Sequence, residues 1–226
     1  MLLYRNKILI TGGSGRFGKV FKKVCHKFKY DFLFPNSKEL DICKEQTIER
    51  YIIKNKPKYL IHLAGLSRPM EKHDKLISES INKNIIGTAN ITKICSKFKI
   101  KLIYVSTCYV YPGLNGNYAE NSPLLPINNY AWSKLGGESS VQMYKNSLIL
   151  RASITQKPFI HNAAFVDFKT NFIFHEDLIP GIIKIINKKG VINIGGNSQS
   201  VYNFAKKYNF KIKKIYAKKV FGSKAR

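Results

Sequence analysis

The sequence is poor in cysteine, in acidic residues and in long apolar runs. Its four cysteines, Cys25, Cys43, Cys95 and Cys108, form no C-x-x-C pair and have no clustered histidines beside them. We therefore expect neither a metal site nor a disulfide framework. No apolar run approaches the roughly 18 to 20 residues that span a bilayer, and the N-terminus lacks the small-residue cleavage site of a signal peptide. These absences predict a cytoplasmic protein with no membrane segment.

Acidic residues are strongly outnumbered, because 13 Asp and Glu face 39 Lys and Arg and leave a formal charge of +26. Such a charge attracts polyanions. The lysines are spread along the whole chain, however, and arginine, which dedicated nucleic-acid surfaces favour, is scarce. We interpret the charge as a diffuse bias in composition, with nonspecific electrostatic binding of nucleic acid as its side effect.

Strand-like and helix-like patterns alternate through the first 150 of the 226 residues. The β-rich apolar runs, separated by helical patterns of which the longest covers 77–98, are 7–11, 31–34, 59–63, 101–106 and 147–151. This alternation predicts an α/β fold: a Rossmann-type doubly wound parallel sheet with helices on both faces. We expect residues 1–151 to form this domain. Residues 152–226 are expected to form a small, reduced C-terminal substrate lobe with elements returning to the sheet.

A glycine loop joins the first predicted strand to the first predicted helix. Gly12, Gly15 and Gly18 follow the spacing that suits a tight turn, a close approach to a pyrophosphate and close helix–strand packing. The free amides at the start of the helix form an anion site. The loop therefore predicts a bound dinucleotide, NAD(H) or NADP(H).

The end of the second predicted strand favours NADP(H). A site for NAD(H) places an acid there for the ribose hydroxyls, whereas this chain has Asn36, Ser37 and Lys38. Neutral and basic groups at this position, together with Arg16 in the glycine loop, would accept a 2′-phosphate. NAD(H) remains the alternative.

Tyr130 and Lys134 lie one helical turn apart in the pattern Tyr-x-x-x-Lys. A neighbouring ammonium favours the phenolate, so we expect the pKa of Tyr130 to be lowered and the phenol to act as a proton donor. Thr107 ends the preceding predicted strand, and the carboxyl end of such a strand opens into the ligand crevice of an α/β sheet. The three side chains are the predicted catalytic set.

Several motifs together resemble the extended short-chain dehydrogenases. They are T-G-G-x-G-x-x-G, then H-L-A-G at 62–65, then S-T-C-Y-V-Y-P-G at 106–113, then Y-x-x-x-K followed by L-G-G-E at 135–138. Within that family the chain is most similar to the dTDP-4-dehydrorhamnose reductases, well over residues 7–151 and faintly beyond. Cys108 stands where the family has Asp, and the Asp-Glu pair of sugar-nucleotide dehydratases is absent, which argues against dehydration.

The resemblance implies reduction of the 4-keto group of a nucleotide-linked deoxy sugar. Thr107 would bind the keto oxygen, Tyr130 would protonate it, and Lys134 would lower the Tyr130 pKa and hold the nicotinamide ribose. The resemblance also permits a homodimer. The expected cofactor contacts are Gly12, Gly15, Arg16, Phe17, Gly18, Asn36, Ser37, Lys38, Asp41, Ile42, Leu63, Ala64, Gly65, Asn84, Tyr130 and Lys134.

Two other functions stay open. One is an epimerase that uses tightly held NAD, in which oxidation and reduction alternate on the same sugar. The other, from a different class, is a catalytically silent module that senses a cofactor or binds nucleic acid. The intact set of Thr107, Tyr130 and Lys134 argues against silence, because a scaffold does not need it.

Overall fold

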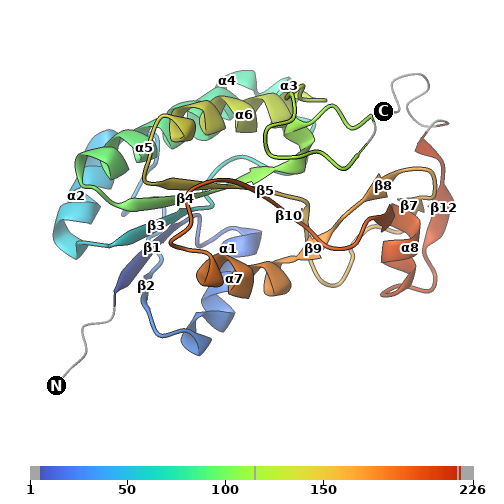
Figure 1. The fold of residues 1–226 in the computed structure, drawn as a ribbon, viewed down its shortest axis with the longest axis horizontal. Helices are drawn as coiled ribbons and strands as arrows, with labels where there is room; N and C mark the ends of the chain where they lie inside the picture. The colour runs from blue at the N-terminus through green and yellow to red at the C-terminus, as the bar shows by residue number, and fades with distance from the viewer. Residues whose placement is uncertain (1–5, 115, 218, 220–226) are drawn as a thin grey trace.

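The centre of the protein is a six-stranded parallel sheet. The structure, a computed structural model, describes residues 6–114, 116–217 and 219. The strand order is β10-β5-β4-β3-β1-β2 (Figure 1). The strands are β1 (Lys7–Thr11), β2 (Asp31–Leu33), β3 (Tyr59–His62), β4 (Lys101–Thr107), β5 (Ser147–Ala152) and β10 (Gly190–Ile194). Every residue of β3, β4 and β5 is buried, as expected of parallel strands covered on both faces. The predicted α/β sheet is confirmed.

Helices cover both faces of this sheet (Figure 1). On one face lie α1 (Arg16–Val24), which continues into the 3-10 turn η1 (Cys25–Lys27), and α7 (His175–Lys184). On the other lie α2 (Glu45–Asn55), α5 (Gly87–Lys97) and α6 (Asn129–Gln142). A separate hydrophobic cluster fills each interface. The strand β10 and the helix α7 come from the C-terminal third and complete the sheet domain.

The single helix predicted over 77–98 is wrong in detail. The segment divides into α4 (Ile77–Ser80), a π-helical turn η2 (Ile81–Ile86) and α5, and a short helix α3 (Lys72–Lys75) precedes it. A π-turn inserts an extra residue per turn and often marks a functional position. Here it carries Asn84, which is 1% exposed and bonded to neighbouring segments. Apolar periodicity alone does not reveal such an insertion.

The remainder forms a small lobe beside the carboxyl ends of β4 and β5 (Figure 1). Its short strands and one helix are β6 (Ile154–Thr155), β7 (Ala163–Phe165), β8 (Lys169–Thr170), β9 (Ile173–Phe174), β11 (Gln199–Ser200), α8 (Val201–Lys206) and β12 (Lys213–Ile215). They pair as β6–β9, β7–β12 and β8–β11. An aromatic cluster that includes Phe159, Phe174 and Phe204 holds them together. The lobe is therefore an ordered unit with its own small core.

The direction of the strand order changes at β1. Strand β2 lies on one side of β1 and β3 on the other, so the loops that follow β1 and β3 separate and leave a crevice between them. Ligands of open α/β sheets bind at such a switch point. Residues 12–18 and 63–70, which follow β1 and β3, therefore border this crevice.

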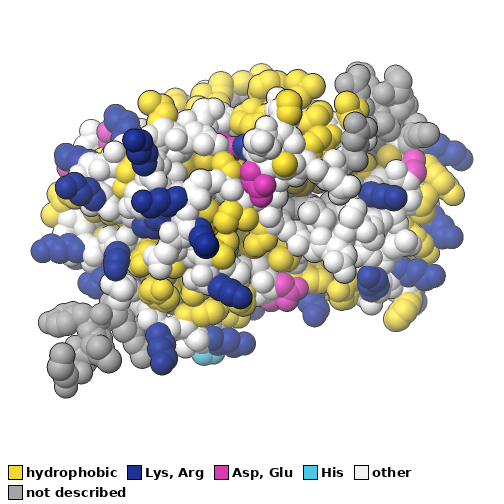
Figure 2. Space-filling model, viewed as in Figure 1, with side chains coloured by type: hydrophobic (Ala, Val, Ile, Leu, Met, Phe, Trp, Pro, Cys, Tyr) yellow, Lys and Arg dark blue, Asp and Glu magenta, His cyan; other side chains and the backbone are white. Residues whose placement is uncertain are grey.

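The surface is basic without a single concentrated patch on the face in Figure 2, where Lys and Arg side chains are scattered over both the sheet domain and the lobe. Among the described residues, every helix is too short or too polar to span a bilayer. The same residues bring together no group of three or more His, Cys, Asp or Glu side chains suited to a metal ion.

Candidate active site

A cleft of about 440 Å³ opens at the switch point and runs from the glycine loop to the C-terminal lobe. Its walls come from the loop after β1, the segment 35–43 after β2, the loop after β3, the end of β4, the start of α6 and the segment 152–156. Segments far apart in the sequence meet here because the carboxyl ends of parallel strands share one edge of the sheet.

The glycine loop has the shape that a dinucleotide requires. Gly12 has a φ of +74°, and a Cβ added there would lie 2.7 Å from the backbone nitrogen of Ala64. A Cβ on Gly18 would lie 2.3 Å from the carbonyl oxygen of Gly12, so only glycine lets α1 begin this close to the turn. No side chain caps the start of α1 at Gly15, and its first turn contains no acidic side chain, so this helix end suits an anion. These residues fit the pyrophosphate of a nicotinamide dinucleotide.

A buried histidine keeps the two cleft loops together. The Thr11 hydroxyl accepts hydrogen bonds from the backbone N–H groups of Leu63 and Ala64, both at 3.3 Å, and lies 2.7 Å from Nδ1 of His62. His62 Nε2 lies 3.1 Å from the Thr88 hydroxyl. Burial, with the charge of Lys134 as a smaller cause, lowers the pKa of His62 to about 3, so the ring is neutral. It has a supporting role.

Most of the predicted cofactor contacts line the cleft. Those that do are Gly12, Gly15, Arg16, Phe17, Gly18, Ser37, Asp41, Ile42, Leu63, Ala64, Gly65, Tyr130 and Lys134. Asn36 and Lys38 do not: the Asn36 side chain accepts hydrogen bonds from the backbone of Lys38 and Glu39 and closes a turn, and Lys38 is exposed. Of the three residues at 36–38, the structure brings Ser37 alone to the cleft.

Asn84 lies behind the cleft and does not line it. Its Oδ1 accepts a hydrogen bond from the backbone N–H of Leu66 at 2.7 Å, and its Nδ2 donates to the Leu66 carbonyl and to the Ser133 hydroxyl. It therefore joins the loop after β3 to helix α6. The resemblance implied a cofactor contact for Asn84, whereas the side chain bonds Leu66 and Ser133 and has a supporting role.

Arg16 points toward the opposite end of the cleft from the one we predicted. Its Nη2 donates to the Ser67 hydroxyl at 3.1 Å, and its charge acts on Arg68 and Tyr130. None of its hydrogen bonds reaches Ser37, where a 2′-phosphate was expected. Arg16 lines the cleft on the Tyr130 side.

All three members of the predicted catalytic set line the cleft. Thr107, 5% exposed at the end of β4, accepts a hydrogen bond from the backbone N–H of Tyr109, and its side chain is near enough to the Tyr130 phenol to lower the pKa of that phenol. Helix α6 begins where the Asn128 side chain accepts a hydrogen bond from the Ala131 N–H at 2.8 Å, a standard N-cap. This cap sets Tyr130 in the first turn of α6, facing the strand end.

The Tyr130 phenol is neutral. Burial raises its pKa to about 12, and the neighbouring Cys108 thiol adds to the rise. The neighbouring Thr107 side chain and the charges of Arg68 and Arg16 act in the opposite direction and lower the pKa. The expected lowering of this pKa is therefore wrong. The phenol carries its proton at neutral pH.

Lys134 lies one turn further along α6 and also lines the cleft. Its ammonium is 4.1 Å from the centroid of the Tyr104 ring, a cation–π contact. Burial lowers its pKa to about 7, and the Glu138 carboxylate opposes that shift. The ammonium faces Tyr104, which explains why it is not among the groups that set the pKa of Tyr130.

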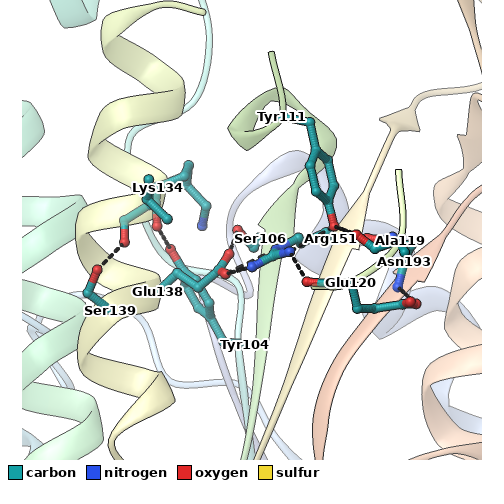
Figure 3. Close-up of polar contacts among 11 residues, drawn as sticks. Tyr104, Ser106, Tyr111, Ala119, Glu120, Lys134, Glu138, Ser139, Arg151 and Asn193 are labelled. Atoms are coloured by element: carbon teal, nitrogen blue, oxygen red, sulfur yellow. Dashed lines mark hydrogen bonds and ion pairs between the residues drawn. The ribbon is translucent and has the colours of Figure 1, made fainter. Parts of the chain in front are cut away.

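A buried polar network supports these groups from behind (Figure 3). Glu138, one turn beyond Lys134, accepts from Nε and Nη2 of Arg151 at 3.0 and 2.5 Å and from the Ser106 hydroxyl at 2.7 Å. Arg151 also donates to the Tyr111 hydroxyl at 2.7 Å, and Tyr111 donates to Asn193 on β10. The network connects α6, β4, β5 and β10 directly beneath Thr107.

The sequence analysis missed several cleft residues. Ser67 and Arg68 follow β3, and His175 begins α7 with its ring stacked on Phe17 at 4.9 Å. Burial is the largest cause that lowers the pKa of His175, to about 4. A charged residue shortly after a predicted strand was the one signal for Arg68. For His175 the sequence indicated a helix start and not a place in the cleft, because its segment is more than 150 residues from Phe17 in the chain.

Comparisons with known proteins agree with this geometry. The chain is 30% identical over 161 residues to methionine adenosyltransferase 2 subunit beta of Xenopus laevis, covering 66% of this chain and 46% of that protein. It is 26% identical over 137 residues to the dTDP-4-dehydrorhamnose reductase of Mycolicibacterium smegmatis, covering 60% and 41%. The matched part thus spans less than half the length of these curated relatives.

Solved structures share the fold. That of dTDP-4-dehydrorhamnose reductase from Bacillus anthracis in complex with NADP has a TM-score of 0.84 at 23% identity and covers 94% of this chain and 85% of that chain. The L780 UDP-rhamnose synthase of Acanthamoeba polyphaga mimivirus has a TM-score of 0.79 at 18% identity, with 97% and 87% covered. The RmlD substrate binding domain profile matches residues 6–167. The chain belongs to the RmlD substrate-binding-domain family.

Proposed function

We propose that this protein reduces the 4-keto group of a nucleotide-linked deoxy sugar with NADPH. The observation that carries the proposal is that Thr107, Tyr130 and Lys134 line the same cleft as the glycine loop. Relatives named dTDP-4-dehydrorhamnose reductase, one of them solved with NADP, support the substrate class and the cofactor.

The residues have complementary roles in this reaction. A bound nicotinamide supplies a hydride to the carbonyl carbon. The neutral Tyr130 phenol transfers its proton to the carbonyl oxygen, so that the ketone becomes an alcohol and charge and atoms balance. The Thr107 hydroxyl hydrogen-bonds the same oxygen and stabilises the negative charge that develops on it. Lys134 lines the same cleft and would hold the nicotinamide ribose.

The raised pKa of Tyr130 suits a proton donor. A phenol with a pKa of about 12 is fully protonated at neutral pH, which is the form that reduction consumes. The positive charges of Arg16 and Arg68, which lower this pKa, stabilise the phenolate that remains after transfer.

The test is NADPH oxidation with dTDP- and UDP-4-keto-6-deoxy sugars as substrates. We expect one mole of NADPH consumed per mole of alcohol formed. The Tyr130→Phe variant should lose about 10²-fold or more in kcat and still bind NADPH. Tyr51→Phe, on the outer helix α2, is the matched control. An equal rate in wild type and Tyr130→Phe for every accepted substrate would refute the proposal.

Two alternatives have distinct outcomes in the same assay. An epimerase would interconvert sugars without net NADPH consumption. A cofactor-binding subunit of a larger assembly, a role suggested by the relatives named methionine adenosyltransferase 2 subunit beta, would bind NADPH and turn over none of the sugars. The presence of Thr107, Tyr130 and Lys134 in one cleft favours the reductase, because subunit assembly does not require these side chains.

A further inference from the structure

Two arginines from different loops meet over the cleft. Arg16 belongs to the glycine loop and Arg68 to the loop after β3, and both line the same cavity. The Arg16 guanidinium donates to the hydroxyl of Ser67, the residue next to Arg68. The charge of Arg68, after burial, contributes to lowering the pKa of Arg16. Two like charges held this close repel each other unless an anion lies between them.

No carboxylate of the described residues balances this pair. Neither arginine takes part in an ion pair within that part of the chain. The acidic residue that lines the cleft is Asp41, which belongs to the segment after β2 and accepts a hydrogen bond from the Cys43 N–H. Lys83, another cation of the lining, is already paired with Glu79. Uncompensated positive charge therefore collects at the Arg16–Arg68 end.

The position of Arg68 distinguishes this end from the glycine loop itself. Its charge acts on Tyr130 and Tyr109 at the catalytic end, on His161 in the segment between β5 and α7, and on His175 at the start of α7. Arg68 thus lies between the reacting groups and the C-terminal lobe.

We infer that Arg68, together with Arg16, forms the subsite for the diphosphate of the sugar nucleotide. The inference rests on the proposed function and specifies how that site holds its substrate. A guanidinium presents paired N–H donors that match phosphate oxygens, and two of them from separate loops clamp both phosphates. The diphosphate is attached to the sugar, so anchoring it beside Tyr130 presents the sugar to the catalytic groups.

Direct binding measurements test the inference without turnover. Calorimetry with dTDP and with UDP, and separately with NADPH, would use the wild type, Arg68→Gln, Arg68→Lys and the control Arg50→Gln, an exposed arginine on α2. We expect Arg68→Gln to weaken nucleoside diphosphate binding about tenfold or more. Arg68→Lys should recover part of the loss, because it keeps the charge without the paired donors. Arg50→Gln and all NADPH affinities should match the wild type.

The other outcomes overturn the inference. Equal dTDP and UDP affinity in wild type and Arg68→Gln would exclude Arg68 from the subsite, although the reductase activity could still stand. A loss of NADPH affinity in Arg68→Gln with nucleoside diphosphate binding intact would assign the arginines to the cofactor. Absence of dTDP and UDP binding by the wild type would also overturn it, whereas the proposed function falls only if no keto sugar is reduced.

Discussion

Arg151 donates two hydrogen bonds to one oxygen of Glu138, and with exposures of 3% and 1% the two side chains form a fully buried ion pair. The second oxygen of Glu138 accepts from Ser106, the residue before Thr107. The pair therefore fixes the distance between helix α6, which carries Tyr130, and the end of β4.

Removing one partner of this pair should destabilise the protein strongly. In Glu138→Gln the Arg151 guanidinium stays buried without its counter-charge, and we expect a loss of about 3–5 kcal/mol in the free energy of unfolding. Urea denaturation measures it. The control is Glu79→Gln in the exposed pair with Lys83, which should cost less than about 1 kcal/mol. Similar losses in both variants would contradict the buried pair.

The buried Lys134 side chain should lower the free energy of unfolding at acidic and neutral pH, because its charged form is removed from water. Its pKa is about 7 in the folded protein and about 10.4 in the unfolded chain, so the unfolded state binds the proton more tightly between these values. The destabilisation is complete below pH 7 and disappears as the pH rises toward 10.4.

We therefore expect Lys134→Met to be more stable than the wild type at pH 6, with a smaller difference at pH 9, and to be inactive. Thermal unfolding at the two pH values provides the measurement. Lys54→Met, at an exposed position of α2, should show no such dependence on pH. A Lys134→Met variant less stable than the wild type at pH 6 would contradict the burial effect.

The choice between NADPH and NADH should depend on Ser37. Ser37 lines the cleft at the end that follows β2, whereas Arg16 is bonded to Ser67 at the other end. A carboxylate in Ser37→Asp would repel a 2′-phosphate, and we expect the NADPH affinity to fall about tenfold while NADH binds normally. In Arg16→Ala the ratio of the two affinities should stay as in the wild type. Fluorescence titration with NADPH and NADH measures both affinities. A changed ratio in Arg16→Ala would show that Arg16 binds the 2′-phosphate, as the sequence analysis predicted.

Gly18 should tolerate no side chain. An added Cβ would meet the Gly12 carbonyl oxygen at 2.3 Å, so Gly18→Ala is expected to cost about 1–3 kcal/mol and to weaken NADPH binding. The contrasting variant is Gly181→Ala in α7, where the nearest atom lies 3.6 Å away. That change should stabilise the helix by about 0.5–1 kcal/mol. Opposite signs in chemical denaturation are the expected result.

The sheet and the glycine loop could be predicted because both depend on local sequence. Strand β1 has the predicted bounds, since buried parallel strands are short apolar runs that need no knowledge of their partners. A small C-terminal lobe was expected, but the pairing of its strands could not be predicted. Its strands have two or three residues each, and their partners lie as far apart as Ala163 and Lys213.

The sequence predicted which residues form the candidate site, but not the orientation of each side chain or its pKa shift. Tyr130, Lys134 and Thr107 meet because a helix cap and a strand end bring them to one edge. The sequence does not tell which way the Arg16 side chain turns, nor that burial outweighs charge in setting the pKa of Tyr130. Such quantities depend on tertiary neighbours, as does the meeting of Arg16 with Arg68.

The buried network of Glu138, Arg151 and Tyr111 includes Asn193 on β10, so it can form only after β10 has been synthesised. The Asn193 side chain binds the Tyr111 hydroxyl, and its N–H donates to the Glu120 carboxylate. The family profile ends at residue 167, before α7 and β10. A nascent chain that had reached only that point would leave β5 as a bare edge and α1 without its packing partner α7. The polar network therefore closes only after β10 has been synthesised.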